Sequence, residues 1–149
     1  MINKVAIIRK GDVEISKLLE AMKRDPNIRE CGAIVSFIGI VRGIGYDGSR
    51  VKYLHYETEE EVAIKELEEV RNEVLRKYDV KEVLIYHYIG TLEPGSDTIY
   101  IMVAAKHREP AFEAARYALE LVKKRVHIWK KEVTEEGEYW IMGEEIVKV

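Results

Sequence analysis

Short apolar runs separated by amphipathic stretches predict a chain that alternates between strands and helices. Residues 5–8 form a brief apolar run, and apolar side chains over 15–22 then recur at the spacing of one helical face. Residues 32–41 are apolar and rich in β-branched side chains, which favours a largely buried strand that ends at Arg42. A turn is expected over the glycine-rich segment 43–48.

Polar and apolar positions alternate over 51–56, which predicts a strand pairing back across the glycine-rich turn with 32–41. The turn itself lacks both the Lys-Ser/Thr ending of a P-loop and the Gly-x-Gly-x-x-Gly spacing of a dinucleotide fold. Neither nucleotide motif is therefore present in this segment.

Two longer helices follow from apolar residues spaced three or four apart, over 63–78 and over 111–126. Thr58 with Glu61 three residues later is typical of a capping box at the start of the first helix. Pro110 suits the first helical position of the second. The C-terminal end of that second helix carries a group of cations.

The remaining apolar runs predict strands. Residues 82–89 and 98–105 flank a Pro-Gly turn and should form a hairpin, while 139–142 and 145–148 follow a turn at 136–137. Because adjacent strands alternate with crossovers, we expect an α+β fold with a mixed, largely antiparallel sheet and flanking helices.

Composition narrows the class of protein. The chain has 149 residues, 47% of them hydrophobic and 34% charged, with a net charge of -3, which predicts one globular domain spanning 1–149. This mildly acidic balance disfavours a nucleic-acid partner. The sole cysteine, Cys31, has no intramolecular disulfide partner, and no apolar stretch is long enough to span a bilayer, so we expect a cytoplasmic protein without a membrane partner.

A local cluster of cations stands out against the acidic background. Five occur within nine residues, and a His-Arg pair lies at the start of the same helix. Like charges held together favour a bound anion, so the cluster predicts a pocket for an anionic small molecule. The residues concerned are Lys123, Lys124, Arg125, Lys130 and Lys131, with His107 and Arg108.

A purely structural interpretation of these cations remains open. Cations in the last turn of a helix stabilise the dipole by about 0.3 to 1 kcal/mol without any function. Lysine pKa falls beside other cations or on burial, which makes Lys123 and Lys130 candidate nucleophiles or bases, although spacing alone does not separate them from Lys124 and Lys131. Arg42, as a lone arginine after a strand, is more often structural.

Other reactive residue types have weaker patterns. The four histidines are scattered and share no metal-ligand spacing with Cys31, so no metal site is expected. Cys31 precedes an apolar strand, which favours a small buried thiol over a catalytic one.

Taken together, Lys123 and the segments 32–42, 107–108, 111–112, 128–132 and 140–141 resemble the large, catalytic subunit family of molybdopterin synthase. The resemblance extends over nearly the whole chain and implies an α/β-hammerhead-like fold. It implies an enzyme that adds two sulfurs to cyclic pyranopterin monophosphate, to form the dithiolene of the molybdenum cofactor. Sulfur arrives as a thiocarboxylate on the C-terminal Gly-Gly tail of a small ubiquitin-like subunit, so no cofactor of the protein itself is expected.

The resemblance also implies roles for individual residues. Lys123 matches the essential lysine of the family, and Lys130 matches a second active-site lysine. The remaining implied substrate-binding residues are Arg42, His107, Arg108, Phe37, Lys131 and Glu132. The family assembles as a homodimer of large subunits within a heterotetramer, and the same assembly is implied here.

Two departures and two alternatives stay open. His127 replaces a usual proline just before the Ile-Trp pair, which could alter how Lys130 enters the pocket, and 58–61 diverges from a stretch that often carries an aromatic. The cationic cluster would also suit a non-catalytic module that binds a nucleotide or RNA phosphate. An assembly protein that kept the fold but lost activity is the other alternative, which the retained Lys123 and Lys130 disfavour.

Overall fold

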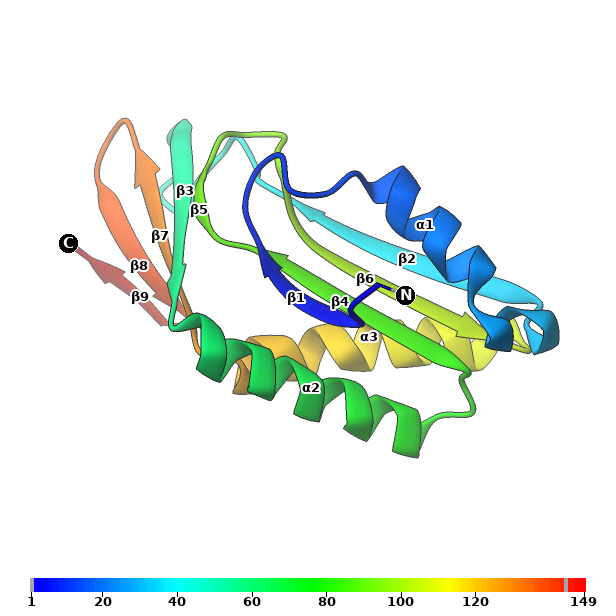
Figure 1. Cartoon of the computed structure of the whole chain (residues 1–149). Helices are drawn as coiled ribbons and strands as arrows, with labels where there is room; N and C mark the ends of the chain where they lie inside the picture. Colours follow the sequence, from blue (N-terminus) through cyan, green and yellow to red (C-terminus); the bar gives the residue numbers. More distant parts are fainter. Residues whose placement is uncertain (1, 144) are drawn as a thin grey trace.

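The computed structural model describes residues 2–143 and 145–149 (Figure 1). Helices and strands alternate much as the apolar pattern predicts. The elements are β1 (Val5–Ile8), α1 (Ile15–Arg24), a 3-10 helix η1 (Pro26–Glu30), β2 (Ala33–Ile40), β3 (Val51–Thr58), α2 (Glu60–Lys77), β4 (Glu82–Tyr88), β5 (Gly90–Leu92), β6 (Asp97–Ala105), α3 (Arg108–Arg125), β7 (Ile128–Thr134), β8 (Glu138–Met142) and β9 (Glu145–Lys148).

The first sheet has the strand order β1-β4-β6-β2, with β1 parallel to β4 and the other pairs antiparallel. Figure 1 shows α1 over one face of this sheet and α2 with α3 over the other. Every residue of β4 is buried, because both of its faces are covered. Val83 and Ile85 pack toward α2 and α3, while Leu84 and Tyr86 pack toward α1.

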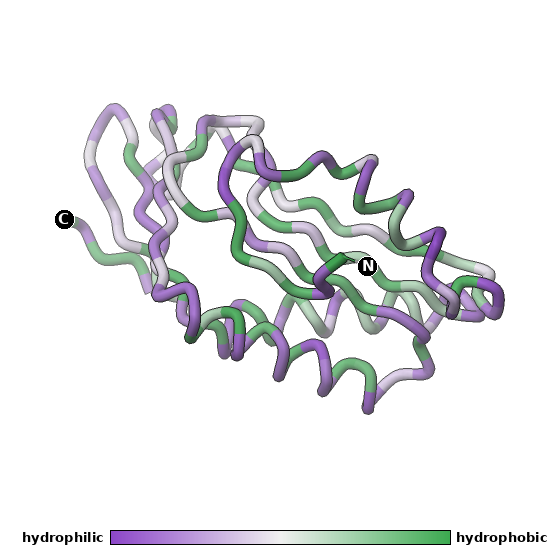
Figure 2. The backbone as a smooth tube through the Cα atoms, viewed as in Figure 1, coloured by the Kyte–Doolittle hydropathy of each residue, from purple (hydrophilic) through white to green (hydrophobic). Residues whose placement is uncertain are grey.

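The second sheet has the order β5-β3-β7-β8-β9 and is antiparallel throughout. It lies at one end of the first sheet, where β3 leads into α2 and α3 leads into β7 (Figure 1). The hydropathy colouring of Figure 2 alternates along α2, whose buried residues are Ala63, Leu67, Val70 and Val74. The predicted α+β class with mainly antiparallel pairing is confirmed, and the strands divide between two sheets.

Two expectations about residues 32–56 were wrong. Strand β3 pairs with β5 and β7, not with β2, because β2 is taken up by β6 in the other sheet. Nor is β2 largely buried: Phe37, Ile38 and Ile40 are 36%, 43% and 58% exposed. Strand β2 ends the strand order of its sheet, so no strand in the described part of the chain pairs with its outer edge.

The helix starts also differ in detail. Thr58 is the last residue of β3, where its Oγ1 donates to the carbonyl of His127 at 2.6 Å, so the predicted capping box does not form and Glu59 precedes α2 instead. Helix α3 begins at Arg108, which puts Pro110 third in the helix. A proline is still tolerated there, because the first N–H groups of a helix have no intrahelical partner.

The other local expectations can also be compared with the structure. The hairpin of β4 and β6 is confirmed, although β5 forms within its connection and pairs with the other sheet. Strands β8 and β9 form as expected. Cys31 is partly exposed rather than buried, and the burial it does have raises the pKa of its thiol. Among the described residues, no helix is long and apolar enough to cross a membrane.

Candidate functional site

Lys123 and Lys130 line the same pocket, which has a volume of about 470 Å³. It lies where the end of α3 meets β3, β4 and β7. The lining residues are Tyr46, Tyr56, His87, Thr98, Ile99, Leu119, Glu120, Val122, Lys123, Lys124, Val126, Ile128, Lys130, Ile141 and Gly143.

Local geometry explains why these two lysines meet. Helix α3 ends at Arg125 and β7 starts at Ile128, so the chain reverses within two residues. Side chains alternate along a strand, so Lys130 and Glu132 share one face of β7. The register of β7 against β3 places Lys130 opposite Tyr56. The short connection between α3 and β7 thus brings Lys130 back beside Lys123.

Several neighbouring groups shift the pKa of Lys130. Burial lowers the pKa of the Lys130 ammonium, and the positive charges of Lys123 and Arg42 lower it further, while the carboxylate of Glu132 acts in the opposite sense. A lysine whose pKa is depressed in this way is a better proton acceptor near neutral pH than an exposed one. These influences also place Arg42 and Lys123 within electrostatic reach of Lys130.

Glu132 ties the glycine-rich loop to the pocket. It is buried, and its carboxylate accepts the backbone N–H of Tyr46 at 3.0 Å. A Cβ on Gly45 would collide with this carboxylate, so a larger residue there would push the Glu132 side chain from its place. Arg42 lies over the Tyr46 ring, 5.6 Å from its centroid. The loop therefore holds Arg42 near Lys130, as the influence of Arg42 on the pKa of Lys130 also indicates.

Asp47 forms hydrogen bonds that hold the other side of the glycine-rich loop. Its carboxylate accepts hydrogen bonds from the Oγ1 of Thr134 at 3.0 Å and from the hydroxyl of Tyr139 at 2.8 Å. The nearby hydroxyl and backbone N–H of Ser49 also donate to it, and together these donors hold the pKa of Asp47 below its usual range. The loop is thus bound to the β7–β8 hairpin at two carboxylates.

Lys131 occupies the opposite face of β7 from Lys130. Its ammonium pairs with Glu138 at 3.2 Å and lies 5.6 Å from the centroid of the Trp140 ring. Strand alternation therefore points Lys131 away from the pocket within the single chain, and its expected role in binding substrate stays a prediction.

Three further predicted residues lie away from the pocket. His107 and Arg108 are exposed at the start of α3. At about 1.5 Å per residue, Arg108 is about 22 Å along the helix axis from Lys123. Phe37 lies on β2 opposite Ile101, on the α3 side of the first sheet. Of the predicted site residues that the structure describes, Lys123 and Lys130 line the pocket, while Arg42 and Glu132 lie near enough to Lys130 to influence its pKa. The roles expected for all of them stay predictions.

The pocket also contains residues that the sequence did not single out. His87 and Tyr56 meet edge to face there, with ring centroids 5.1 Å apart. The imidazole of His87 bonds through Nδ1 to the carbonyl of Tyr88 at 2.6 Å. No motif signals these residues, because they come from separate strands and only the crossing of the two sheets unites them.

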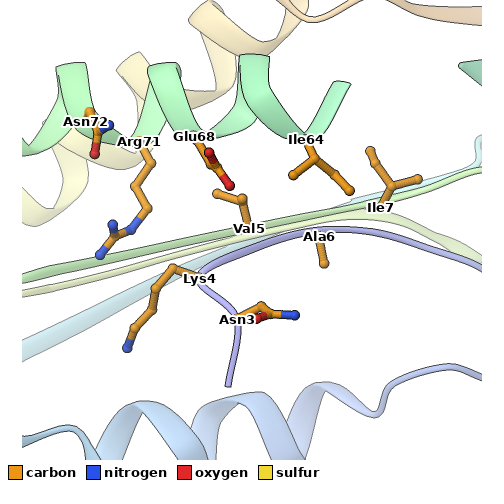
Figure 3. Close-up of a pocket in the computed structure, with 9 residues that line it drawn as sticks. All are labelled: Asn3, Lys4, Val5, Ala6, Ile7, Ile64, Glu68, Arg71 and Asn72. Carbon is orange, nitrogen blue, oxygen red and sulfur yellow. The ribbon is translucent and has the colours of Figure 1, made fainter. Parts of the chain in front are cut away.

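A second hollow, of about 600 Å³, lies between β1 and α2 (Figure 3). Lys4 and Arg71 line it, but both cations are already paired with carboxylates. Lys4 pairs with Asp25 at 2.7 Å and with Glu82 at 3.1 Å, and Arg71 pairs with Glu82 at 2.5 Å. This hollow is therefore a poor site for an anion. Among the described residues, no group of His, Cys, Asp or Glu has an arrangement that could hold a metal.

The sequence of the chain and its two-sheet fold match those of known proteins. The family model described as MoaE protein matches residues 8–125. The chain belongs to the MoaE family. The family resemblance inferred from the sequence is thereby confirmed.

Relatives in the MoaE family carry a consistent name. The molybdopterin synthase catalytic subunit of Pyrococcus abyssi (strain GE5 / Orsay) is 43% identical over 148 residues, covering 99% of this chain and 97% of the relative. The solved molybdopterin synthase of Staphylococcus aureus superposes with a TM-score of 0.83 at 30% identity, covering 95% of this chain and 98% of that one.

A third comparison concerns the fold. A chain in the protein–protein complex of subunits 1 and 2 of molybdopterin-converting factor from Helicobacter pylori 26695 superposes with a TM-score of 0.72. It is 22% identical, and the match covers 96% of this chain and 92% of that one.

Proposed function

We propose that this MoaE-family protein is the catalytic subunit of a molybdopterin synthase. It transfers sulfur from the C-terminal thiocarboxylate of a small ubiquitin-like subunit to cyclic pyranopterin monophosphate, in the cytoplasm, with residues 1–149 acting as one domain. The observation that carries the proposal is the shared pocket of Lys123 and Lys130, in which burial and neighbouring cations lower the pKa of Lys130.

The two lysines have different surroundings and so different roles. Lys123 is exposed at the edge of the pocket, where its ammonium attracts the anionic thiocarboxylate. Lys130 is more enclosed, and its depressed pKa suits it to accept and return a proton as sulfur attacks the pterin side chain. Arg42, held over Tyr46, is placed to bind the pterin phosphate.

The partner supplies the sulfur, so the pocket needs no cysteine nucleophile and no cofactor of its own. An extended C-terminal tail ending in Gly-Gly is narrow enough to enter a pocket of about 470 Å³. Two subunits assemble in the Helicobacter protein, which has the same fold. We extend that arrangement to this chain as part of the proposal.

A second copy of the chain would complete the anion site. Among residues 2–143 and 145–149 no strand pairs with the outer edge of β2, which carries exposed Phe37 and Ile38 and so suits pairing with another β2. The start of β2 lies opposite Ala105, close to His107, and its end lies opposite Asp97, close to the pocket.

A twofold axis through the middle of two antiparallel β2 strands would set the start of one beside the end of the other. His107 and Arg108 of one copy would then approach Arg42 of its partner. This arrangement reconciles the expected role of His107 and Arg108 in binding substrate with their distance from Lys123 within one chain, and it gives Phe37 a place at the interface beside the pocket.

Single-turnover conversion of cyclic pyranopterin monophosphate, with and without the thiocarboxylated partner, tests the proposal. We expect molybdopterin only with the partner, and no turnover from a folded Lys123→Ala variant. Lys65→Ala is the matched control, because it removes an exposed cation from α2 that does not line the pocket. A protein that bound many phosphates in a salt-sensitive way but made no product would instead be the non-catalytic binding module.

A further inference from the structure

His87 is a buried imidazole that borders the lysine pocket and has no role in the mechanism above. It is the penultimate residue of β4 and is only 8% exposed. The same pocket holds Lys130, whose charge acts on the His87 ring, and Tyr56, which packs against that ring edge to face. The pocket thus contains a buried imidazole beside the two lysines, and the mechanism above gives this imidazole no function.

The hydrogen bond made by His87 fixes which ring nitrogen carries the proton. Nδ1 lies 2.6 Å from the carbonyl oxygen of Tyr88. A carbonyl oxygen only accepts hydrogen bonds, so Nδ1 must be the protonated nitrogen. In the neutral ring, Nε2 then carries a lone pair and acts as an acceptor.

The neutral ring is also the favoured form. Burial lowers the pKa of His87 to about 4, and the nearby positive charge of Lys130 acts in the same direction, against the Tyr88 carbonyl. Lys130 comes from β7 and Tyr56 from β3, so the groups facing the ring are a cation and a phenol. Near neutral pH the imidazole is therefore uncharged.

Nε2 has no hydrogen-bond partner among the described residues, whose only bond to this ring is the one at Nδ1. A fully enclosed nitrogen without a partner would be a buried unsatisfied atom, and the described part of the chain contains none. Nε2 therefore retains contact with open space, and the open space beside His87 is the lysine pocket.

We propose that His87 is a further substrate-contacting residue, whose Nε2 accepts a hydrogen bond from an N–H or O–H group of the bound pterin. The proposal rests on the proposed function. Lys123 and Lys130 line the pocket with cationic donors, and the positive charge of Arg42 lies near Lys130, which suits the anionic groups of the two reactants. A pterin also carries hydrogen-bond donors, and the neutral imidazole accepts one of them without adding a competing charge.

Two substitutions of His87 test the contributions of Nδ1 and Nε2 separately. His87→Asn keeps a donor near the Nδ1 position, for the carbonyl of Tyr88, but removes the acceptor at Nε2. His87→Gln reaches further and returns an amide oxygen near the Nε2 position. We expect kcat/KM for the pterin to fall about tenfold or more in His87→Asn, and to recover in part in His87→Gln. His55→Asn is the matched control, because His55 lies outside the pocket and bonds to Thr91 and Glu57.

A measurement on the wild-type protein does not depend on how the variants fold. The ¹⁵N resonance of His87 Nε2 should have the shift of an unprotonated nitrogen at pH 7 and should move toward the hydrogen-bonded range when cyclic pyranopterin monophosphate binds. A resonance that stays in place while the pterin binds would overturn the proposal. So would equal losses of activity in folded His87→Asn and His87→Gln.

The outcomes also separate this inference from the proposed function. Wild-type protein that makes no molybdopterin with its thiocarboxylated partner would refute the proposed function. Normal wild-type turnover with an unchanged kcat/KM in His87→Asn would refute only the role of His87.

Discussion

The carboxylate of Glu66 on α2 binds His127 at two points. Its Oε1 accepts the backbone N–H of His127 at 3.0 Å, and its Oε2 lies 2.5 Å from Nδ1 of the ring. His127 lies in the reversal between Lys123 and Lys130, and its carbonyl accepts the hydroxyl of Thr58. The connection that joins the two lysines is therefore held by both α2 and β3.

Loss of this tether should loosen the lysine pair. We expect Glu66→Ala to lower kcat/KM about two- to tenfold, the range that corresponds to one net hydrogen bond of about 0.5 to 1.5 kcal/mol. Glu66→Gln should lose less, because an amide oxygen still accepts the backbone N–H of His127. Glu69→Ala, an exposed position one turn further along α2, is the control for single-turnover rates. Equal rates in Glu66→Ala and wild-type protein would show that the tether has no part in positioning the lysines.

The pKa of Lys130 should respond in opposite directions to two neighbours. Removing the positive charge in Lys123→Met should raise the pKa of Lys130, because like charge disfavours the ammonium form. Glu132→Gln should lower it, since the carboxylate favours that form. NMR titration of the Lys130 side chain in the three proteins measures both shifts. Displacements of the same sign would contradict the arrangement of charges described here.

The buried His87 should make stability depend on pH. Its folded pKa of about 4 lies below the ordinary value of 6.5, so the unfolded chain binds the extra proton between these limits. Stability conferred by the neutral ring is therefore present above pH 6.5 and lost as pH falls toward 4, by up to about 3 kcal/mol.

Urea unfolding at pH 7 and pH 4.5 tests this dependence. Wild-type protein should lose more unfolding free energy between the two pH values than His87→Asn, which lacks the titrating group. Matching losses in the two proteins would mean that His87 is not held neutral by burial.

The proposed twofold site predicts complementation between inactive variants. Lys123→Ala and Arg108→Ala should each be impaired alone, but a mixed dimer would contain one pocket with both residues intact. Random exchange of subunits should restore about a quarter of wild-type activity, since half of the dimers are mixed and each has one complete site. Failure of the mixture to exceed the two separate variants, with exchange shown to occur, would place Arg108 outside the pocket.

The exposed edge of β2 gives an independent test of the same assembly. Ile38→Asp places a charge on a 43% exposed side chain and should shift the protein toward monomer in analytical ultracentrifugation. Lys52→Asp, on an exposed position of β3, is the matched control and should leave the sedimentation unchanged. A monomeric wild-type protein at working concentrations would remove the basis for the twofold site.

The apolar periodicity of the sequence determined the elements themselves. The stripes over 63–78 and 111–126 became α2 and α3, because a helix buries one face at fixed spacing whatever it packs against. The pairing of 51–56 could not be predicted in the same way. Its partners β5 and β7 lie far along the chain, and alternation along a strand does not specify which neighbour it meets.

For the candidate site, too, some residues could be predicted from the sequence and others could not. The sequence indicated Lys123, Lys130 and Arg42, because clustered charge and family motifs are visible along the chain. Only the tertiary structure brought His87 and Tyr56 to these lysines, and turned Lys131 away from them. Charge pattern is a local property of the sequence, whereas the walls of a pocket form where two sheets and a helix end meet, and that meeting depends on long-range packing.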